Sequence, residues 1–284
     1  MTVTAPRIEA YEPQAPAFHH PPQKIAPDTY VIRQLQGEGT APLAVYINSM
    51  VILGKEPVIV DVGTEANRRQ WLDDVFSLIE PDAVRWVFIS HDDHDHTGNL
   101  KEVLALCPNA TLVSSWFQVE RLACSFNLPL HRMRWVDDGG SFDAGDRVLA
   151  AVRPPAYDSP TTRGLFDPTT GVYWASDCFA VPVTGPADDI AELEPESWRQ
   201  GLTMFQQALM PWLPLVDAVR YNAAIAKLND LDIRMIASGH SPLVAGDYVE
   251  TAIDLLYELP FAAPTPLPGQ AELEAILAAM MAHP

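Results

Sequence analysis

The segment that most constrains this chain is ISHDDHDHTGNL, which runs from Ile89 to Leu100. It places three histidines and three aspartates in the six consecutive positions from His91 to His96, directly after the apolar stretch VRWVFIS. Imidazole and carboxylate groups are common ligands of divalent transition metals, and so dense a cluster is improbable as a plain solvated turn. The segment therefore predicts a metal site at the end of a buried strand.

Three later residues of the same chemical kind also follow predicted strands. Asp158 comes after RVLAAVR and Pro154-Pro155, Asp177 after GVYWAS, and His240 after IRMIAS. A rigid sheet positions the loops at its strand ends, where binding and catalytic residues gather. We therefore expect these three residues to share one site with those of the opening segment, which are His91, Asp93, Asp95 and His96.

Hydrophobic periodicity predicts a layered α/β fold. Strands are indicated by TYVIRQL, LAVYINSMVIL, PVIVDV and, as the final strand, IRMIAS. Helices are indicated over ANRRQWLDDVFSLI, Leu100–Leu106, Pro195–Asp230 and the tail from Tyr248. This order predicts two mixed sheets packed together and flanked by helices, in a single domain over residues 30–284. Residues 1–29 carry many prolines and no periodicity, so we expect an arm that wraps a surface or a neighbouring subunit.

Charge and composition argue against several classes of partner. The formal net charge is −19, and no basic run interrupts it, so nucleic acid and anionic membranes would be repelled. No stretch approaches the roughly 20 apolar residues that cross a bilayer, and no signal segment opens the chain, so we expect a cytoplasmic protein. Cys107, Cys124 and Cys178 are too widely spaced for a disulfide framework, and we expect them to stay reduced.

The motif H-x-D-x-D-H followed by T-G-N-L resembles the metal signature of the metallo-β-lactamase superfamily, which is H-x-H-x-D-H. Asp61, in DVG after a strand, is similar to that superfamily's structural aspartate and would lie behind the metal ligands. The resemblance covers about Tyr30 to Glu258 and implies the metallo-β-lactamase αββα sandwich, with two mixed sheets flanked by helices.

Two departures from that signature resemble one branch of the superfamily. Asp93 stands where the hydrolase branch has histidine, and a carboxylate there is similar to the flavodiiron motif H-x-E-x-D-H. The position of the third histidine falls in PPAYDSPTT, where Asp158 is the most natural replacement and Tyr157 the adjacent competitor. The successive intervals from His96 to Asp158, Asp177 and His240 are 62, 19 and 63 positions, which agrees with the family's layout.

The resemblance also implies a division of ligands between two metal ions. One ion would be held by His91, Asp93 and Asp158, the other by Asp95, His96 and His240, with Asp177 between them. Four carboxylates formally neutralise two divalent ions and make a poor hydrolytic Lewis acid, whereas hard oxygen donors favour iron or manganese over zinc. We therefore expect iron, with manganese or zinc as alternatives.

Three functions fit these residues. The first is a di-iron oxidoreductase or O2- or NO-binding protein, whose reactive site is a metal-bridging hydroxide or O2 position. The second is a metal-dependent hydrolase of an ester, lactone, thioester or phosphodiester, and the third a non-catalytic sensor or binding module.

No flavodoxin-like domain is recognised, so we expect no flavin on this chain, and a separate reductase or a partner subunit would supply electrons. The family's tendency implies a head-to-tail homodimer.

The other histidines and the cysteine next to Asp177 are expected to be neither metal ligands nor redox groups. His94 lies between two proposed ligands and should point away from the metals. His19 and His20 fall in the proline-rich arm and are expected to be solvated. Cys178, next to Asp177, is expected to be a small buried filler and not a redox thiol.

Overall fold

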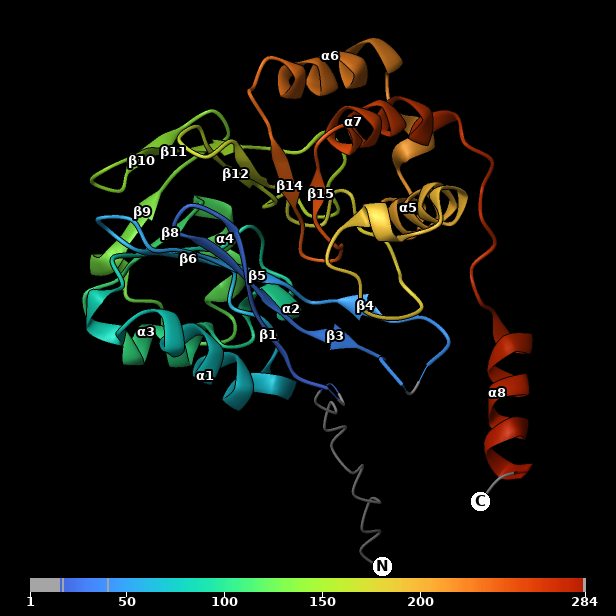
Figure 1. The fold of residues 1–284 in the computed structure, drawn as a ribbon, viewed down its shortest axis with the longest axis horizontal. Coiled ribbons are helices and arrows are strands. Elements are labelled where there is room, and N and C mark those ends of the chain that lie inside the picture. Colours follow the sequence, from blue (N-terminus) through green and yellow to red (C-terminus); the bar gives the residue numbers. More distant parts are fainter. Residues whose placement is uncertain (1–15, 17, 40, 283–284) are drawn as a thin grey trace, which may run out of the picture.

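Two β-sheets lie face to face in the computed structural model, which describes residues 16, 18–39 and 41–282 (Figure 1). Helices α1 (Arg68–Leu78) and α3 (Leu100–Leu106) cover the outer face of one sheet. Helices α5 (Pro195–Leu209), α6 (Ala218–Asn229) and α7 (Tyr248–Glu258) cover the other. The predicted layered α/β sandwich is confirmed.

The first sheet has seven strands in the order β1-β2-β5-β6-β7-β8-β9. They are β1 (His20–Ala26), β2 (Thr29–Arg33), β5 (Ser49–Ile52), β6 (Val58–Val60), β7 (Trp86–Phe88), β8 (Thr111–Ser114) and β9 (Met133–Trp135). The strands from β6 to β9 are mutually parallel, and helices α1, α3 and α4 (Trp116–Leu122) lie in their connections. Parallel strands end at the same edge of a sheet, so the segments after β6 and β7 are neighbours.

The second sheet has six strands in the order β10-β11-β12-β13-β14-β15. They are β10 (Ser141–Asp143), β11 (Val148–Val152), β12 (Gly164–Asp167), β13 (Val172–Trp174), β14 (Met235–Ala237) and β15 (Val244–Ala245). The parallel pair of β13 and β14 places the residues that follow both strands at one edge. A small two-stranded sheet pairs β3 (Leu35–Gln36) with β4 (Val45–Tyr46).

The strand sequences are almost continuously apolar because successive side chains point to opposite faces of a sheet and both faces are covered. In β6, Val58 and Val60 pack into the core between the sheets, whereas Ile59 packs beneath the outer helices. In β13, Trp174 packs between the sheets and Tyr173 on the opposite side, against the core formed with α5, α6 and α7. Side chains on both faces of each sheet are therefore buried, as in other doubly covered sheets.

The domain begins earlier than predicted. Residues His20–Ala26, placed in the arm by their prolines, form strand β1 at the edge of the first sheet, paired antiparallel with β2. An edge strand tolerates Pro21 and Pro22 because it has no neighbour on one side and its register shifts after His20. The boundary at Tyr30 was therefore wrong for residues 20–29, while residues 1–15 and 17 lie outside the described part of the chain.

Three further details differ from expectation. IRMIAS is not the final strand, because the chain turns back after β14 to form β15. The helical stretch from Pro195 to Asp230 is two helices, with a break at the 3-10 turn η5 (Leu213–Leu215) that contains Pro214. His20, which was expected to be solvated, is only 16% exposed and lies 2.7 Å from Glu38, whereas His19 is 47% exposed, as expected, and lies 2.9 Å from Asp74.

The last helix, α8 (Gln270–Ala282), stands away from the rest of the chain (Figure 1). It follows the connection from the 3-10 turn η6 (Leu259–Phe261), which includes Pro264, Pro266 and Pro268. Among the helices in the described ranges, none is both long and apolar enough to cross a bilayer.

Candidate metal centre

Four strand ends bring all seven predicted ligand residues together. His91, Asp93, Asp95 and His96 follow β7, Asp158 follows β11, Asp177 follows β13, and His240 follows β14. Their donor atoms form three groups in which all atoms lie within 4.8 Å of one another. The groups are His91 with His96 and Asp177, Asp95 with His96 and His240, and His91 with Asp93 and Asp158. The last two groups coincide with the division of ligands that the family resemblance implied.

Each histidine of the cluster is held through its Nδ1 atom. His240 Nδ1 lies 2.6 Å from the carbonyl oxygen of Tyr46, which can only accept, so Nδ1 donates. His96 Nδ1 lies 2.9 Å from the carboxylate of Asp61 and donates in the same way. His91 Nδ1 lies 3.0 Å from the hydroxyl of Ser176. When Nδ1 carries the proton, Nε2 presents its lone pair toward the cluster, which is the usual arrangement of a metal-ligating histidine.

Three of the inward-facing atoms have no hydrogen-bond partner. They are His91 Nε2, His96 Nε2 and Asp177 Oδ1, and all are buried. The 2.9 Å approach of His96 Nε2 to Asp177 Oδ1 lacks the alignment of a hydrogen bond. An unsatisfied buried polar atom costs about 1–3 kcal/mol, so three converging ones point to a missing partner that accepts lone pairs. A metal cation is such a partner, and the residues fit it.

The charges of the cluster support the same conclusion. Burial lowers the pKa of His96, but Asp95, Asp177 and Asp61 outweigh it and hold that pKa well above its usual value. Burial also opposes the charged form of His240, yet Asp177 and Asp95 raise its pKa to about 10. The carboxylates thus draw positive charge to the imidazoles, and bound cations would replace those protons.

Asp158 differs from the histidines in the cause of its raised pKa. Burial, followed by the neighbouring charge of Asp177, raises the pKa of its carboxyl group. Its Oδ2 atom lies 3.6 Å from His91 Nε2. The ring of the competing residue, Tyr157, packs 5.3 Å from the ring of Trp212 and beneath Arg153, whereas the Asp158 carboxylate lies in one donor group with His91 and Asp93. His94 is exposed and belongs to none of the three groups, as expected.

Asp61 anchors the cluster from behind. Its buried carboxylate accepts from Ser90 N at 2.6 Å, Ser90 Oγ at 2.7 Å, Trp174 Nε1 at 2.9 Å and His96 Nδ1 at 2.9 Å. Asp61 and Ser176 both adopt a φ of 55°, in the left-handed region that non-glycine residues rarely occupy. Such strain persists where surrounding contacts over-determine it, and it is typical of functional sites.

Sequence reasoning missed several supporting residues. Ser90 and Ser176 each directly precede a ligand-type residue at the end of a strand, and their hydroxyls lie 2.9 Å apart behind His91. The side-chain amide of Asn48 donates to the carbonyls of Ser238 and Ser241, which flank the turn that carries His240. A small polar residue before each ligand was the available signal for the two serines.

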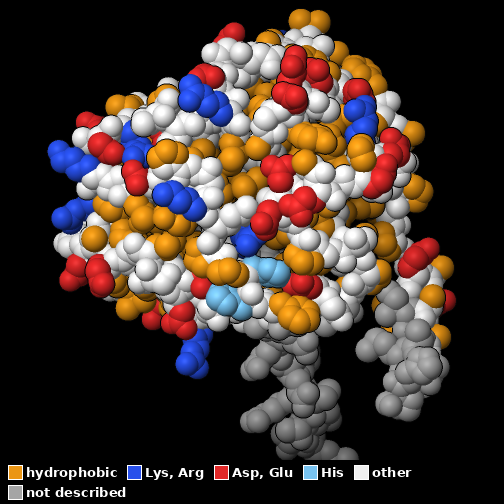
Figure 2. Space-filling model, viewed as in Figure 1, with side chains coloured by type: hydrophobic (Ala, Val, Ile, Leu, Met, Phe, Trp, Pro, Cys, Tyr) orange, Lys and Arg blue, Asp and Glu red, His pale blue; other side chains and the backbone are white. Residues whose placement is uncertain are grey.

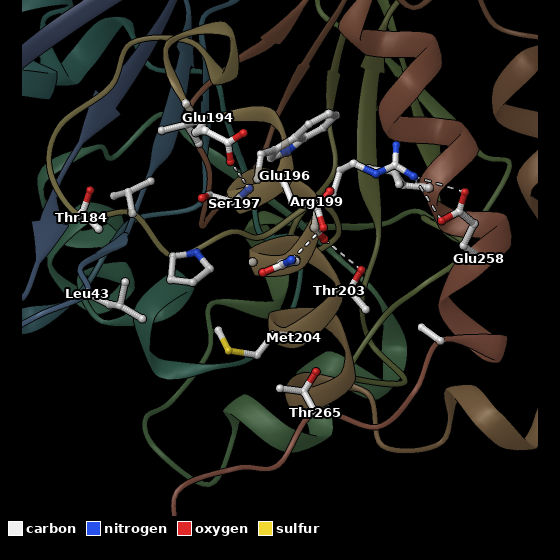
Figure 3. Close-up of a pocket in the computed structure, with 18 of the residues that line it drawn as sticks. Leu43, Thr184, Glu194, Glu196, Ser197, Arg199, Thr203, Met204, Glu258 and Thr265 are labelled. Atoms are coloured by element: carbon white, nitrogen blue, oxygen red, sulfur yellow. Dashed lines mark hydrogen bonds and ion pairs between the residues drawn. The ribbon is translucent and has the colours of Figure 1, made fainter.

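A large cavity lies elsewhere on the molecule. It has a volume of about 820 Å³ and is lined by residues of α5, the segment 182–184, the end of α7 and the segment 262–265, including Ser197, Met204 and Thr265 (Figure 3). Arg199 pairs there with Glu258 at 3.3 Å, and Glu194 caps α5 by accepting from Ser197 N. None of the seven ligand-type residues lines this cavity, so it is a separate feature.

Acidic side chains dominate the half of the surface around α5 and α7, whereas most basic side chains visible in the same view lie on the opposite half (Figure 2). The three cysteines are free, with Cys107 and Cys178 buried and Cys124 exposed. Burial raises the pKa of the Cys178 thiol. This agrees with a buried filler and not with a reactive thiolate.

Comparisons with known proteins fit this geometry. The family model described as ODP family beta lactamase matches residues 45–241. The chain is 28% identical over 233 residues to putative diflavin flavoprotein A 3 of Nostoc sp., covering 78% of this chain and 39% of that protein. The flavodiiron protein from Giardia intestinalis matches 86% of this chain and 60% of its own, with 19% identity and a TM-score of 0.74. Rubredoxin oxygen:oxidoreductase from Desulfovibrio gigas matches 86% of this chain and 62% of its own, with 16% identity and a TM-score of 0.73.

These matches differ in how much they establish. The solved structures support the fold, and the chain spans about two-fifths of the length of its Nostoc relative. The family model covers more than two-thirds of the chain, including every residue of the donor cluster. The chain therefore belongs to the ODP family of β-lactamase-like domains and is related to the flavodiiron proteins.

Proposed function

We propose that this chain is a di-iron protein that binds and reduces O2 or NO with electrons from an external donor. The observation that carries the proposal is the convergence of seven imidazole and carboxylate residues, three of whose buried donor atoms lack partners. The similarity in fold to a flavodiiron protein and to a protein named rubredoxin oxygen:oxidoreductase supports this chemistry over hydrolysis.

The donor set favours iron. Asp93, Asp95, Asp158 and Asp177 contribute carboxylate oxygens, and three imidazoles complete the cluster. Oxygen-rich sites suit iron and manganese, and their negative charge stabilises higher oxidation states and weakens hydrolytic power. A pair of bound iron ions would supply the reversible electron transfer that O2 or NO reduction requires.

The residues also define how a small molecule reaches the cluster. The side chains of His91, His96 and Asp177 are no more than 5% exposed, whereas those of Asp93 and Asp95 are 48% and 32% exposed. The cluster is therefore closed behind the histidines and open beside these two aspartates. A diatomic molecule needs no large cavity, and an electron donor would approach from the same open side.

The residues that contact the Nδ1 atoms of the three histidines hold the imidazole rings in place. The contacts of Nδ1 with Tyr46, Asp61 and Ser176 fix each ring, so that Nε2 cannot rotate away from the cluster. Preorganised rings avoid reorganisation when the charge of the centre changes during electron transfer. The chain's own residues thus hold the donor geometry constant through the redox cycle.

The first experiment is metal analysis of protein purified from iron-supplemented cells, paired with optical spectra before and after dithionite and then air. We expect two iron ions per chain and near-ultraviolet absorption that bleaches on reduction and returns in air. His240→Ala should lower the iron content, whereas the matched control His94→Ala, an exposed histidine of the same motif, should not.

Two results would decide against the proposal. Zinc with no optical change, reproduced after iron reconstitution, would favour a metal-dependent hydrolase and lead to an ester and phosphodiester screen. Iron that air reoxidises once, without sustained O2 or NO consumption when an artificial electron donor is present, would favour a binding or sensory role over a reductase.

A further inference from the structure

Asp92 is the aspartate of the HDDHDH segment that the proposed metal centre does not use. It lies between His91 and Asp93 in sequence but belongs to none of the three donor groups. Its side chain is only 7% exposed, so an unpartnered carboxylate there would be costly. Its contacts therefore show what this residue does.

Those contacts lead to the loop that carries Asp158. Thr161 Oγ donates to Asp92 Oδ1 at 2.5 Å, and Ser159 Oγ donates to the same oxygen at 3.3 Å. On the other side, the guanidinium of Arg121 from α4 pairs with Asp92 Oδ2. One buried carboxylate thus joins two hydroxyl groups of the second-sheet loop to the strand-end loop of the first sheet.

The Asp158 loop is held at its end as well. Arg163 N donates to the carbonyl of Ser90 at 2.8 Å, immediately before strand β12. Within the loop, Thr162 N donates to Ser159 O at 3.0 Å, and Thr162 Oγ donates to Asp158 Oδ1 at 3.2 Å. The position of the Asp158 carboxylate is therefore set by a short turn whose residues are tied to Ser90 and Asp92.

Asp158 needs such a restraint because two other carboxylates of the cluster repel it. Its donor oxygen lies within 4.8 Å of that of Asp93, and Asp177 carries a further negative charge beside them. Carboxylates this close repel each other, and the repulsion is stronger on the side of Asp177, which is shielded from water, than on the side of the exposed Asp93. A loose loop would relieve that repulsion by turning Asp158 outward. The metal ion held by His91, Asp93 and Asp158 would then lose one ligand.

We propose that Asp92 is a positioning residue that holds Asp158 in the ion group of His91, Asp93 and Asp158 through the hydroxyls of Thr161 and Ser159. The inference rests on the proposed function in one respect only, since it requires metal binding by the cluster. It is independent of whether the resident metal is iron and of whether the chain reduces O2.

The test removes one hydroxyl at constant shape. Thr161→Val deletes the shorter contact to Asp92, and Thr161→Ser restores the hydroxyl. Thr170→Val is the matched control, because Thr170 Oγ also donates to a buried aspartate, Asp167 at 3.0 Å, but at the hairpin between β12 and β13. Metal-free protein is titrated anaerobically with Fe²⁺ against a competing chelator, and unfolding is followed by circular dichroism.

Thr161→Val is expected to bind one ion as wild type does and the other roughly 10–100-fold more weakly, which is the usual effect of losing a contact behind a metal ligand. Thr161→Ser should recover most of that affinity. Thr170→Val should lose stability without losing affinity, which separates positioning from a structural role. Asp92→Ala should reproduce the selective loss.

The outcomes are distinguishable. If wild type binds two ions and Thr161→Val binds both with unchanged affinity, the positioning role is overturned and the proposed function stands. An equal loss at both ions, not recovered in Thr161→Ser, also overturns it. If wild type binds no metal after reconstitution, the proposed function fails and the positioning role falls with it.

Discussion

Replacing Asp61 with asparagine tests how the cluster is held from behind. The asparagine side chain has the shape of aspartate but carries one accepting oxygen and one donating amide group. In the structure, Asp61 Oδ1 accepts from Ser90 N, while Oδ2 accepts from Ser90 Oγ, Trp174 Nε1 and His96 Nδ1. Whichever oxygen becomes the amide nitrogen will face a donor.

The least damaging orientation sets the expected magnitude. It places the amide nitrogen against Ser90 N, so that the buried Ser90 N–H and the new amide group both lack an acceptor, at a cost of about 1–3 kcal/mol for each unsatisfied group. The three remaining contacts change from charge-assisted to neutral hydrogen bonds, which weakens each, although the neutral amide is less costly to bury. We expect Asp61→Asn to lose about 2–4 kcal/mol of unfolding free energy, or roughly 5–15 °C in Tm for a chain of this size.

The assay combines stability with metal affinity. Urea unfolding of metal-free wild type and variant measures the first, and anaerobic Fe²⁺ titration against a chelator measures the second. His96 loses its charged partner in the variant, so we expect the ion bound by His96 to be held about 10–100-fold more weakly. Asp167→Asn is the control, because Asp167 is equally buried and accepts from Arg147 and Thr170, away from the cluster.

The two variants together can refute the reasoning. The control should lose stability and keep its metal affinity, whereas Asp61→Asn should lose both. If Asp61→Asn unfolds within about 0.5 kcal/mol of wild type, the size of a neutral surface substitution, the carboxylate does not anchor its four donors. If its metal affinity also equals that of wild type, Asp61 has no role in orienting His96.

Two further predictions concern the thiols and the protons of the cluster. In native protein a thiol reagent should modify Cys124 alone, because Cys124 is exposed whereas Cys107 and Cys178 are buried. Burial also raises the pKa of Cys107 to about 11, which keeps its thiol unreactive. Modification of Cys178 before unfolding would contradict its role as an inert filler. Metal loading at pH 7.5 should release protons, since the pKa of His240 is raised to about 10 and a ligating imidazole must be neutral. Calorimetry in buffers of different ionisation enthalpy measures this release, and an apparent affinity that does not increase between pH 6.5 and 8.5 would disprove it.

Much of the fold could be predicted because local patterns and tertiary demands agree. The helix predicted over Leu100–Leu106 has those bounds in the structure, with Leu100, Val103 and Leu104 buried. The apolar run before His91 forms strand β7, whose two faces are both covered. The chemical types of the seven donor residues were readable in the same way, because each follows a strand and a sheet collects its strand ends at one edge.

The prediction failed where local signals oppose the tertiary environment. Prolines in His20–Ala26 indicate an irregular arm, yet an edge position lets this segment pair with β2. Strand β15 has only two residues and carries too little periodicity to be recognised. It exists because the turn after His240 brings the chain back alongside β14.

By itself, the sequence determined the fold class, the layered order and the seven candidate donor residues, since these depend on hydrophobic period and side-chain chemistry. Only the tertiary structure decided how those donors are held. The contacts of Asp61 with Trp174 and of Asp92 with Thr161 join residues 113 and 69 positions apart. Hydroxyl, indole and carboxylate partners at such separations leave no local pattern, because the packing of two sheets, not the spacing along the chain, brings them together.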